Sequence, residues 1–147
     1  PPPAAQNGAA LSIPTVNIYS PLTTFPLDGV SWAIDPWDPL VGHMQGTGWV
    51  DRPGNIALGG HSEYPDGTPG VFAGLYGLAI GDPIFLLVDG QERRYVVTSV
   101  RSVDFDDLSV VYPTDTPHLT LITCDIPTYD PANGQYWERL VVVAQPN

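Results

Sequence analysis

Cys124 is the only cysteine of the chain, and its position suits a nucleophile. It ends the apolar, β-branched run 118–124 and is followed at once by a polar loop. A side chain at a strand end lies at the rim of a sheet or barrel, where a substrate can reach it, whereas a structural cysteine more often lies mid-strand. A single cysteine also excludes an intramolecular disulfide and a Cys-rich zinc site. The thiol is therefore either an inert core group or the centre of covalent chemistry.

His61 is the histidine best placed to serve that thiol. It follows the apolar run 55–58 and the pair Gly59–Gly60, which allows close approach of another backbone or a ligand. A neighbouring imidazole can take the proton of a thiol and return it to a leaving group. Taken alone, a loop histidine is more often a solvated or capping residue, and His43 and His118 fit that interpretation.

Arg139 begins the last apolar run, 138–144, fifteen positions after Cys124 (139 − 124). A hairpin of that length could return the arginine beside the thiol. Its fixed charge and forked donors suit a developing oxyanion or a substrate backbone. Taken alone, the same residue is an edge-strand charge that discourages aggregation.

Short strands must position these three residues. Pro (17) and Gly (15) are spread along the chain and leave little room for long helices. We expect a short helix or 3₁₀ segment over 71–78 and a hairpin turn at Gly90. Expected strands cover residues 12–19, 55–58, 83–89, 91–103, 118–124 and 138–144, and expected loops cover 21–40, 62–69, 104–117 and 125–135. The pattern predicts a mainly all-β barrel or sandwich, with a flexible linker over 1–10 and one domain over 11–147.

Charge limits the classes of partner. Sixteen acidic residues against five basic ones give a net charge of −11, which argues against nucleic acid as a partner. No run approaches the roughly 18 apolar residues that span a bilayer.

Three segments together resemble the sortase family. TLITC (120–124) resembles the family's TLxTC signature, which ends a strand and carries its nucleophile. GNIALGGHS (54–62) is similar to the segment leading to the family's histidine, and ERLVVVA (138–144) matches the strand bearing its arginine. IPTVNIY (13–19) and the stretch 69–86 are further similarities, so the resemblance covers nearly all of the chain from about Leu11 to Ala144.

The resemblance implies a closed antiparallel β-barrel of about eight strands with one or two short helices. It implies a transpeptidase in which Cys124 attacks an LPxTG-like sorting motif and forms a thioacyl intermediate that an amine resolves. His61 would transfer protons and Arg139 would stabilise the oxyanion or bind the substrate. Thr123, beside the nucleophile, is a candidate substrate-binding residue, although a β-propensity residue without substrate contact fits equally.

The same resemblance implies partners and a location. Substrates would be surface proteins or pilins with sorting signals, and the acceptor would be an amine such as a peptidoglycan precursor or a pilin lysine. The enzyme would be extracytoplasmic and held at the bacterial cell surface by a membrane anchor outside this sequence. No cofactor is implied. The acidic stretch 104–115 lacks EF-hand spacing, so no metal is assigned, while calcium regulation stays open.

Two other functions stay open. One is a sortase-like thiol peptidase that mainly hydrolyses its acyl-enzyme, and the other is a non-enzymatic β-barrel binding module with Cys124 in its core. A papain-like hydrolase fits less well, because such enzymes place the cysteine before the histidine in the chain. The sorting motif, the acceptor, the subclass and the choice between anchoring and pilus assembly do not follow from the residues.

Overall fold

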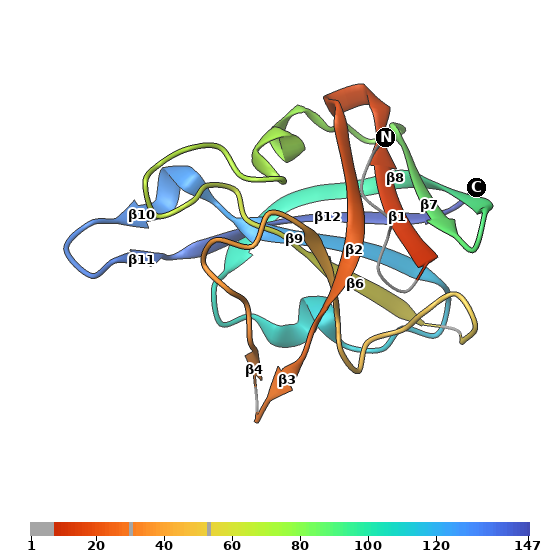
Figure 1. Ribbon diagram of the computed structural model, residues 1–147, viewed down its shortest axis with the longest axis horizontal. Helices are drawn as coiled ribbons and strands as arrows, with labels where there is room; N and C mark the ends of the chain where they lie inside the picture. Colours follow the sequence, from red (N-terminus) through yellow and green to blue (C-terminus); the bar gives the residue numbers. More distant parts are fainter. Residues whose placement is uncertain (1–7, 30, 53) are drawn as a thin grey trace.

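The computed structural model describes residues 8–29, 31–52 and 54–147 of the chain. Eight strands form a closed barrel in the order β1-β2-β5-β6-β9-β12-β8-β7 (Figure 1). They are β1 (Ala9–Ile13), β2 (Ile18–Phe25), β5 (Val41–Met44), β6 (Asn55–Gly59), β7 (Pro83–Val88), β8 (Gln91–Asp104), β9 (His118–Cys124) and β12 (Glu138–Pro146). Two small hairpins stand outside it: β3 (Leu27–Asp28) with β4 (Ser31–Trp32), and β10 (Tyr129–Asp130) with β11 (Gln135–Tyr136).

The expected barrel of about eight strands is confirmed, but it is mixed and not purely antiparallel. β2 pairs with β5 and β6 pairs with β9 in parallel. Parallel neighbours need a long crossover connection. Residues 60–117 supply one between β6 and β9, and residues 26–40 supply the other between β2 and β5. Because of the first crossover, β6 and β9 are far apart in the sequence but lie side by side and end at the same end of the barrel.

The N-terminal elements differ from the sequence-based expectation. The segment expected as one strand over 12–19 is a hairpin, because Pro14–Val16 form a 3₁₀ turn and Asn17 takes a positive φ of 61° that reverses the chain. β2 then continues through Phe25, into the range 21–40 expected to be loop. The linker expected over 1–10 overlaps β1 at Ala9 and Ala10, which are both buried; residues 1–7 lie outside the described residues.

Short 3₁₀ segments take the place of the expected one or two short helices. They are η2 (Pro14–Val16), η3 (Ala73–Gly77), η4 (Leu108–Val111) and η5 (Ile126–Thr128), and the described residues contain no α-helix. η3 confirms the 3₁₀ alternative for 71–78. Closely spaced Gly and Pro explain why none of them lengthens. No helix in the described ranges combines the length and apolar character needed to cross a membrane.

The hairpin turn expected at Gly90 is confirmed. Asp89 and Gly90 connect β7 to β8 with φ values of 50° and 81°. Positive φ at both central residues is the primed two-residue turn that matches the twist of paired strands. This turn lies at the end of the barrel away from the β10–β11 hairpin (Figure 1).

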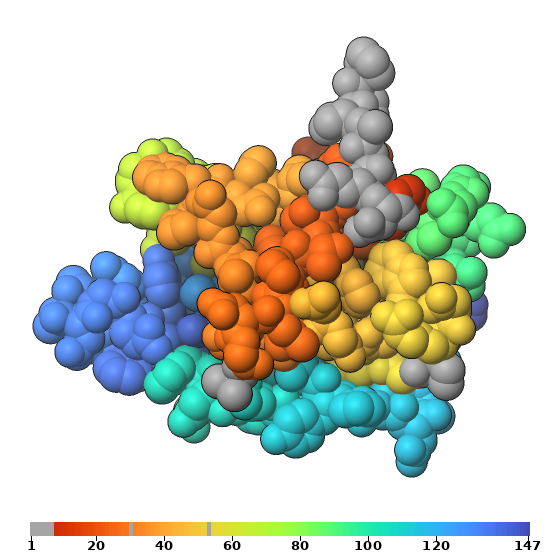
Figure 2. Space-filling view, turned by 60° about the horizontal axis from the view of Figure 1, so that its bottom comes forward, coloured from red at the N-terminus to blue at the C-terminus, as the bar shows by residue number. Residues whose placement is uncertain are grey.

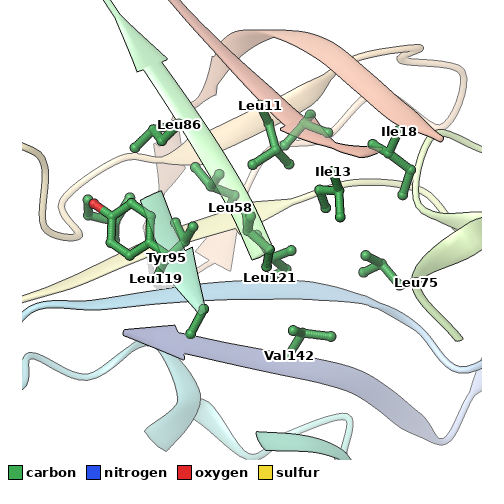
Figure 3. Packing of buried hydrophobic residues seen from close by; sticks show 14 of the residues in the cluster. Leu11, Ile13, Ile18, Leu58, Leu75, Leu86, Tyr95, Leu119, Leu121 and Val142 are labelled. Carbon is green, nitrogen blue, oxygen red and sulfur yellow. The ribbon is translucent and has the colours of Figure 1, made fainter. Parts of the chain in front are cut away.

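The barrel interior is filled by aliphatic side chains (Figure 3). Leu58 of β6 and Leu121 of β9 are register partners with no solvent exposure, and Leu11 of β1 faces Leu86 of β7 in the same way. A sealed interior leaves substrate chemistry to the barrel ends and loops. The ends of β6 and β9 are thus rigidly placed by core packing.

Asn55 fastens the long loop 105–117 to the first residue of β6. Its side-chain amide donates to the carbonyl oxygens of Val110 at 2.8 Å and Tyr112 at 3.2 Å. Its Oδ1 accepts from the Thr120 hydroxyl at 2.6 Å, and both residues are buried. The bond to Thr120 is buried, and the two bonds to the loop are partly buried.

Asn55→Ala is expected to lower the free energy of unfolding by about 2–4 kcal/mol, because it removes one buried and two partly buried hydrogen bonds and leaves the Thr120 hydroxyl without a partner. Urea unfolding would measure it. A double-mutant cycle with Thr120→Val isolates the Asn55–Thr120 bond from the two loop contacts. A change below about 0.5 kcal/mol for Asn55→Ala would contradict the assigned role.

Candidate active site

Cys124 is the last residue of β9 and carries a free thiol. It is half-buried and lines a pocket of about 470 Å³ at one end of the barrel. The strand-end position proposed from the sequence therefore does bring the thiol to an accessible rim. The core alternative, in which the side chain is fully enclosed, does not fit this placement.

His61 reaches the same pocket because β6 and β9 are parallel and end together. Two contacts join the strand ends just beyond the ladder. The Gly60 N–H donates to the Ile122 carbonyl at 3.2 Å, and the Thr123 hydroxyl donates to the Gly60 carbonyl at 2.8 Å. A Cβ on Gly60 would lie 2.9 Å from the Phe72 ring, so only glycine lets the chain pass here.

The His61 ring is oriented by a backbone carbonyl from a distant loop. Its Nε2 lies 2.7 Å from the Asp35 carbonyl oxygen, which can only accept a hydrogen bond. Nε2 must therefore carry the proton, and Nδ1 is left as the basic nitrogen of the neutral ring. The Tyr64 ring packs against the imidazole with 5.8 Å between centroids.

Arg139 is the cross-strand partner of Cys124 in the β9–β12 register. Directly paired residues place their side chains on the same face, so the guanidinium lies beside the thiol. Its Nη1 donates to the carbonyl oxygens of Tyr136 at 2.8 Å and Glu138 at 3.3 Å. Arg139 is not among the residues that line the pocket.

Thr123 does not reach the pocket. It is 3% exposed, and its hydroxyl is engaged by the Gly60 carbonyl. This contact positions the segment that carries His61. The structure thus gives Thr123 a supporting contact beside His61, and its role in substrate binding stays a prediction.

Asp125, directly after the nucleophile, anchors the following loop. Its carboxylate accepts from the Tyr76 hydroxyl at 2.7 Å and the Ser102 hydroxyl at 2.6 Å. Tyr76 also accepts from the Ile126 N–H at 2.7 Å. Burial and the bond to Asp125 raise the pKa of Tyr76 to about 12, so this hydroxyl remains protonated as a donor. The backbone after Cys124 is thereby held in place.

The pocket walls come from the loop after His61 and from the β10–β11 hairpin. Glu63 receives a hydrogen bond from the Tyr136 hydroxyl, which ties these two segments together. Ser62 also lines the pocket; it is 1% exposed, and its hydroxyl has no partner among the described residues. The complete lining is Pro36, His61, Ser62, Glu63, Tyr64, Pro65, Gly67, Cys124, Tyr129, Gly134 and Tyr136.

The surroundings of Cys124 shift the pKa of its thiol in both directions. Burial raises the pKa of the thiol, Arg139 lowers it, and the Glu63 carboxylate raises it. The resting thiol is therefore mostly protonated near neutral pH, so a base would have to accept its proton before the sulfur could act as a nucleophile. In the part of the chain that the structure describes, no group of three or more His, Cys, Asp or Glu side chains is placed to hold a metal ion.

Glu63→Gln is expected to lower the pKa of the Cys124 thiol, because it removes a negative charge that opposes the thiolate. The rate of alkylation by iodoacetamide, followed against pH, would report this pKa. Alkylation of the variant should then rise at a lower pH than in the wild type. Glu92→Gln, on the far hairpin, is the matched control and should leave the profile unchanged. An unaltered or raised thiol pKa in Glu63→Gln would refute the interaction.

Sequence reasoning missed the contacts that orient the site. Asp35, whose carbonyl contacts His61, is 26 residues away from it in the sequence. Glu63 and Tyr136, which are bonded to each other, are 73 residues apart. Neither carries a local pattern. Glu63 had one usable signal: it lies two residues after His61, within the segment that must leave the strand end beside the thiol.

One end of the closed β-barrel carries a free thiol, an imidazole and a guanidinium. These are the functional groups that cysteine-dependent acyl transfer uses. The chain belongs to the sortase family, whose members are cysteine transpeptidases: the family model for the sortase domain matches residues 11–147. Sortase D of Bacillus subtilis is 29% identical over 124 residues, which are 84% of this chain. The chain spans 57% of that relative's length.

Solved sortases share the fold. A lid mutant of sortase A from Corynebacterium diphtheriae aligns with a TM-score of 0.73 and 25% identity, over 97% of this chain and 70% of that one. Sortase C1 of Streptococcus agalactiae aligns equally well, with 25% identity over 96% and 67%. A sortase D5 transpeptidase of Clostridium perfringens has a TM-score of 0.73 at 19% identity, over 97% and 82%, and supports the fold alone.

Proposed function

We propose that this domain is a transpeptidase that cleaves an LPxTG-like sorting motif and joins the acyl fragment to an amine. The observation that carries the proposal is the convergence of Cys124 and His61 on one pocket, with Arg139 paired opposite the thiol. Family membership supports the reaction class.

The reaction divides into two acyl transfers. In the first, His61 takes the thiol proton, the Cys124 sulfur attacks the scissile carbonyl, and the C–S bond forms as the C–N bond breaks. The proton on His61 goes to the leaving amine. In the second, the acceptor amine attacks the thioester, the new C–N bond forms as the C–S bond breaks, and the proton that the amine loses passes through His61 to the departing thiolate. Arg139 donors would stabilise the oxyanion in both steps.

The pocket suits an extended peptide with both apolar and polar groups. Tyr129 and Tyr136 offer aromatic walls with 4.7 Å between ring centroids. The unpartnered Ser62 hydroxyl offers a hydrogen bond to a peptide group. Natural substrates would be surface proteins or pilins bearing a sorting signal, and acceptors would be a peptidoglycan precursor or a pilin lysine. The domain would work on the extracytoplasmic side, anchored through a membrane segment outside this sequence.

Incubation with a panel of LPxTG-like peptides and triglycine, followed by mass spectrometry of peptides and intact protein, tests the proposal. We expect a transient adduct on Cys124 and a product joined to triglycine. Predominant hydrolysis despite saturating amine would instead identify a thiol peptidase. No adduct with any peptide, combined with a thiol inert to iodoacetamide in the folded protein, would overturn the enzymatic function.

A further inference from the structure

Glu63 is the only acidic residue that lines the pocket of Cys124 and His61, and none of the described residues lining it is a lysine or an arginine. The Glu63 carboxylate forms no ion pair within the described ranges. Its negative charge acts at the sulfur, because it raises the pKa of the Cys124 thiol. A concave pocket with one uncompensated negative charge attracts a cation.

Three tyrosine rings line the pocket together with this carboxylate. Tyr64, Tyr129 and Tyr136 come from the loop after His61 and from the β10–β11 hairpin, which lie at the same end of the molecule (Figures 1 and 2). The Tyr129 and Tyr136 rings are tilted by 44° to one another. The electron-rich face of an aromatic ring attracts a positive charge, and several such faces beside a carboxylate are typical of sites for ammonium groups. Acidic residues are common over this molecule, so it is this combination that distinguishes the pocket.

Glu63 is held in a fixed position but keeps one carboxylate oxygen available. Its backbone forms a bridge with Pro69, and its Oε2 accepts a hydrogen bond from the Tyr136 hydroxyl. Oε1 has no hydrogen-bond partner among the described residues, and the residue is half-buried. A carboxylate can accept about four hydrogen bonds. An ammonium group can therefore bind Glu63 without displacing Tyr136.

The acceptor of the proposed reaction brings a positive charge to this pocket. A primary amine is an ammonium ion near neutral pH, and it must lose one proton to water before its nitrogen attacks the thioester. As the new C–N bond forms, the nitrogen becomes positive again until a second proton passes through His61 to the departing thiolate. A carboxylate in the same pocket therefore stabilises both the bound acceptor and the transition state of its attack.

We propose that Glu63, together with the surrounding tyrosine rings, binds the ammonium group of the acceptor and directs its nitrogen to the acyl group on Cys124. This inference rests on the proposed function, and it identifies Glu63 as the residue that selects a cationic amine. Water carries no charge, so the same contact favours transfer over hydrolysis. Another source of an ammonium group is a lysine within the sorting motif.

Competition between two nucleophiles for one acyl-enzyme tests the proposal. p-Nitrophenyl acetate acetylates the Cys124 thiol directly and releases p-nitrophenol, so no sorting motif is required. Intact-protein mass spectrometry then gives the second-order rate constants for deacetylation by glycinamide, an ammonium ion at neutral pH, and by hydroxylamine, which is mostly uncharged there. Both nucleophiles displace the same thiolate, so the ratio of the two constants cancels any effect of a substitution on the thiol itself.

Glu63→Gln is expected to lower the glycinamide-to-hydroxylamine ratio by about 5-fold, the effect of losing one partly exposed ion pair. Added salt should lower the ratio of the wild type, because it screens the same charge. Glu63→Asp keeps the charge and should retain part of the preference for glycinamide. Glu92→Gln, on the β7–β8 hairpin at the other end of the barrel, is the matched control and should leave the ratio unchanged.

A ratio in Glu63→Gln within about 1.5-fold of the wild-type value overturns the proposal, and so does an equal loss in Glu92→Gln. If Glu63→Gln leaves the ratio unchanged but slows acylation by a sorting peptide with lysine, and not by its glutamine counterpart, the ammonium site belongs to the acyl donor and the proposal is wrong. The expected loss of the ratio in a protein that cleaves no LPxTG-like peptide would support the ammonium site and overturn the sorting function. A thiol that p-nitrophenyl acetate fails to acetylate overturns both.

Discussion

Replacing Cys124 with Ala is expected to abolish adduct formation, peptide cleavage and transfer to amine, with a loss of on the order of 10⁴-fold or more. The free thiol, which is the proposed nucleophile, lies in a pocket shared with His61, and no other cysteine exists to replace it. Intact-protein mass spectrometry during turnover would show the thioacyl species on the wild type and its absence from the variant.

Stability controls separate this chemical effect from unfolding. Cys124 is only half-buried, so its truncation should cost roughly 1 kcal/mol. A wild-type-like melting curve with no turnover would locate the defect in the chemistry. Cleavage retained by a folded Cys124→Ala protein would refute a covalent mechanism through this thiol.

Replacing Arg139 with Gln is expected to reduce kcat/KM for peptide cleavage by about 10²–10³-fold, the usual cost of removing a preorganised oxyanion donor. The guanidinium lies across the ladder from Cys124, and backbone carbonyls of Tyr136 and Glu138 hold one of its nitrogens. Its other donors remain for substrate. The same substitution should raise the pKa of the thiol, because Arg139 favours the thiolate.

Comparison with Arg139→Lys distinguishes charge from geometry. Lysine keeps the charge and should restore the thiol pKa toward its wild-type value, but it lacks the planar fork and should recover only part of the rate. Arg101→Gln controls for the loss of one surface cation. If Arg139→Gln leaves kcat/KM within about threefold of wild type, Arg139 is not an oxyanion donor.

The elements that carry the three proposed catalytic residues were predictable from local pattern. β9 and β12 are apolar, β-branched runs, and each is bounded by polar loop residues near Cys124 and Arg139. The β7–β8 turn followed from Asp89–Gly90, whose residue types favour positive φ. These features depend on neighbours in sequence and therefore appear in the sequence itself.

Contacts between distant segments were not predictable. The second half of β2 was predicted as loop because of Pro21 and the acidic, proline-rich stretch after it. β2 pairs with β5 in parallel, and this pairing depends on residues 26–40 to bring the chain back. The protonation of His61 at Nε2 depends on the Asp35 carbonyl, which every residue type supplies. Such contacts are set by topology, because a backbone group has no signature in the sequence.

Closure of the barrel also determines how a peptide is recognised. β9, which ends at the thiol, is paired with β6 on one side and with β12 on the other, so it offers no unpaired row of N–H and C=O groups beside Cys124. An extended substrate in the thiol pocket is therefore unable to pair with β9 by strand addition, the mode that gives sequence-tolerant main-chain affinity. Selection of substrates must come from loop side chains around the pocket, and changes in those loops would alter specificity while leaving the barrel intact.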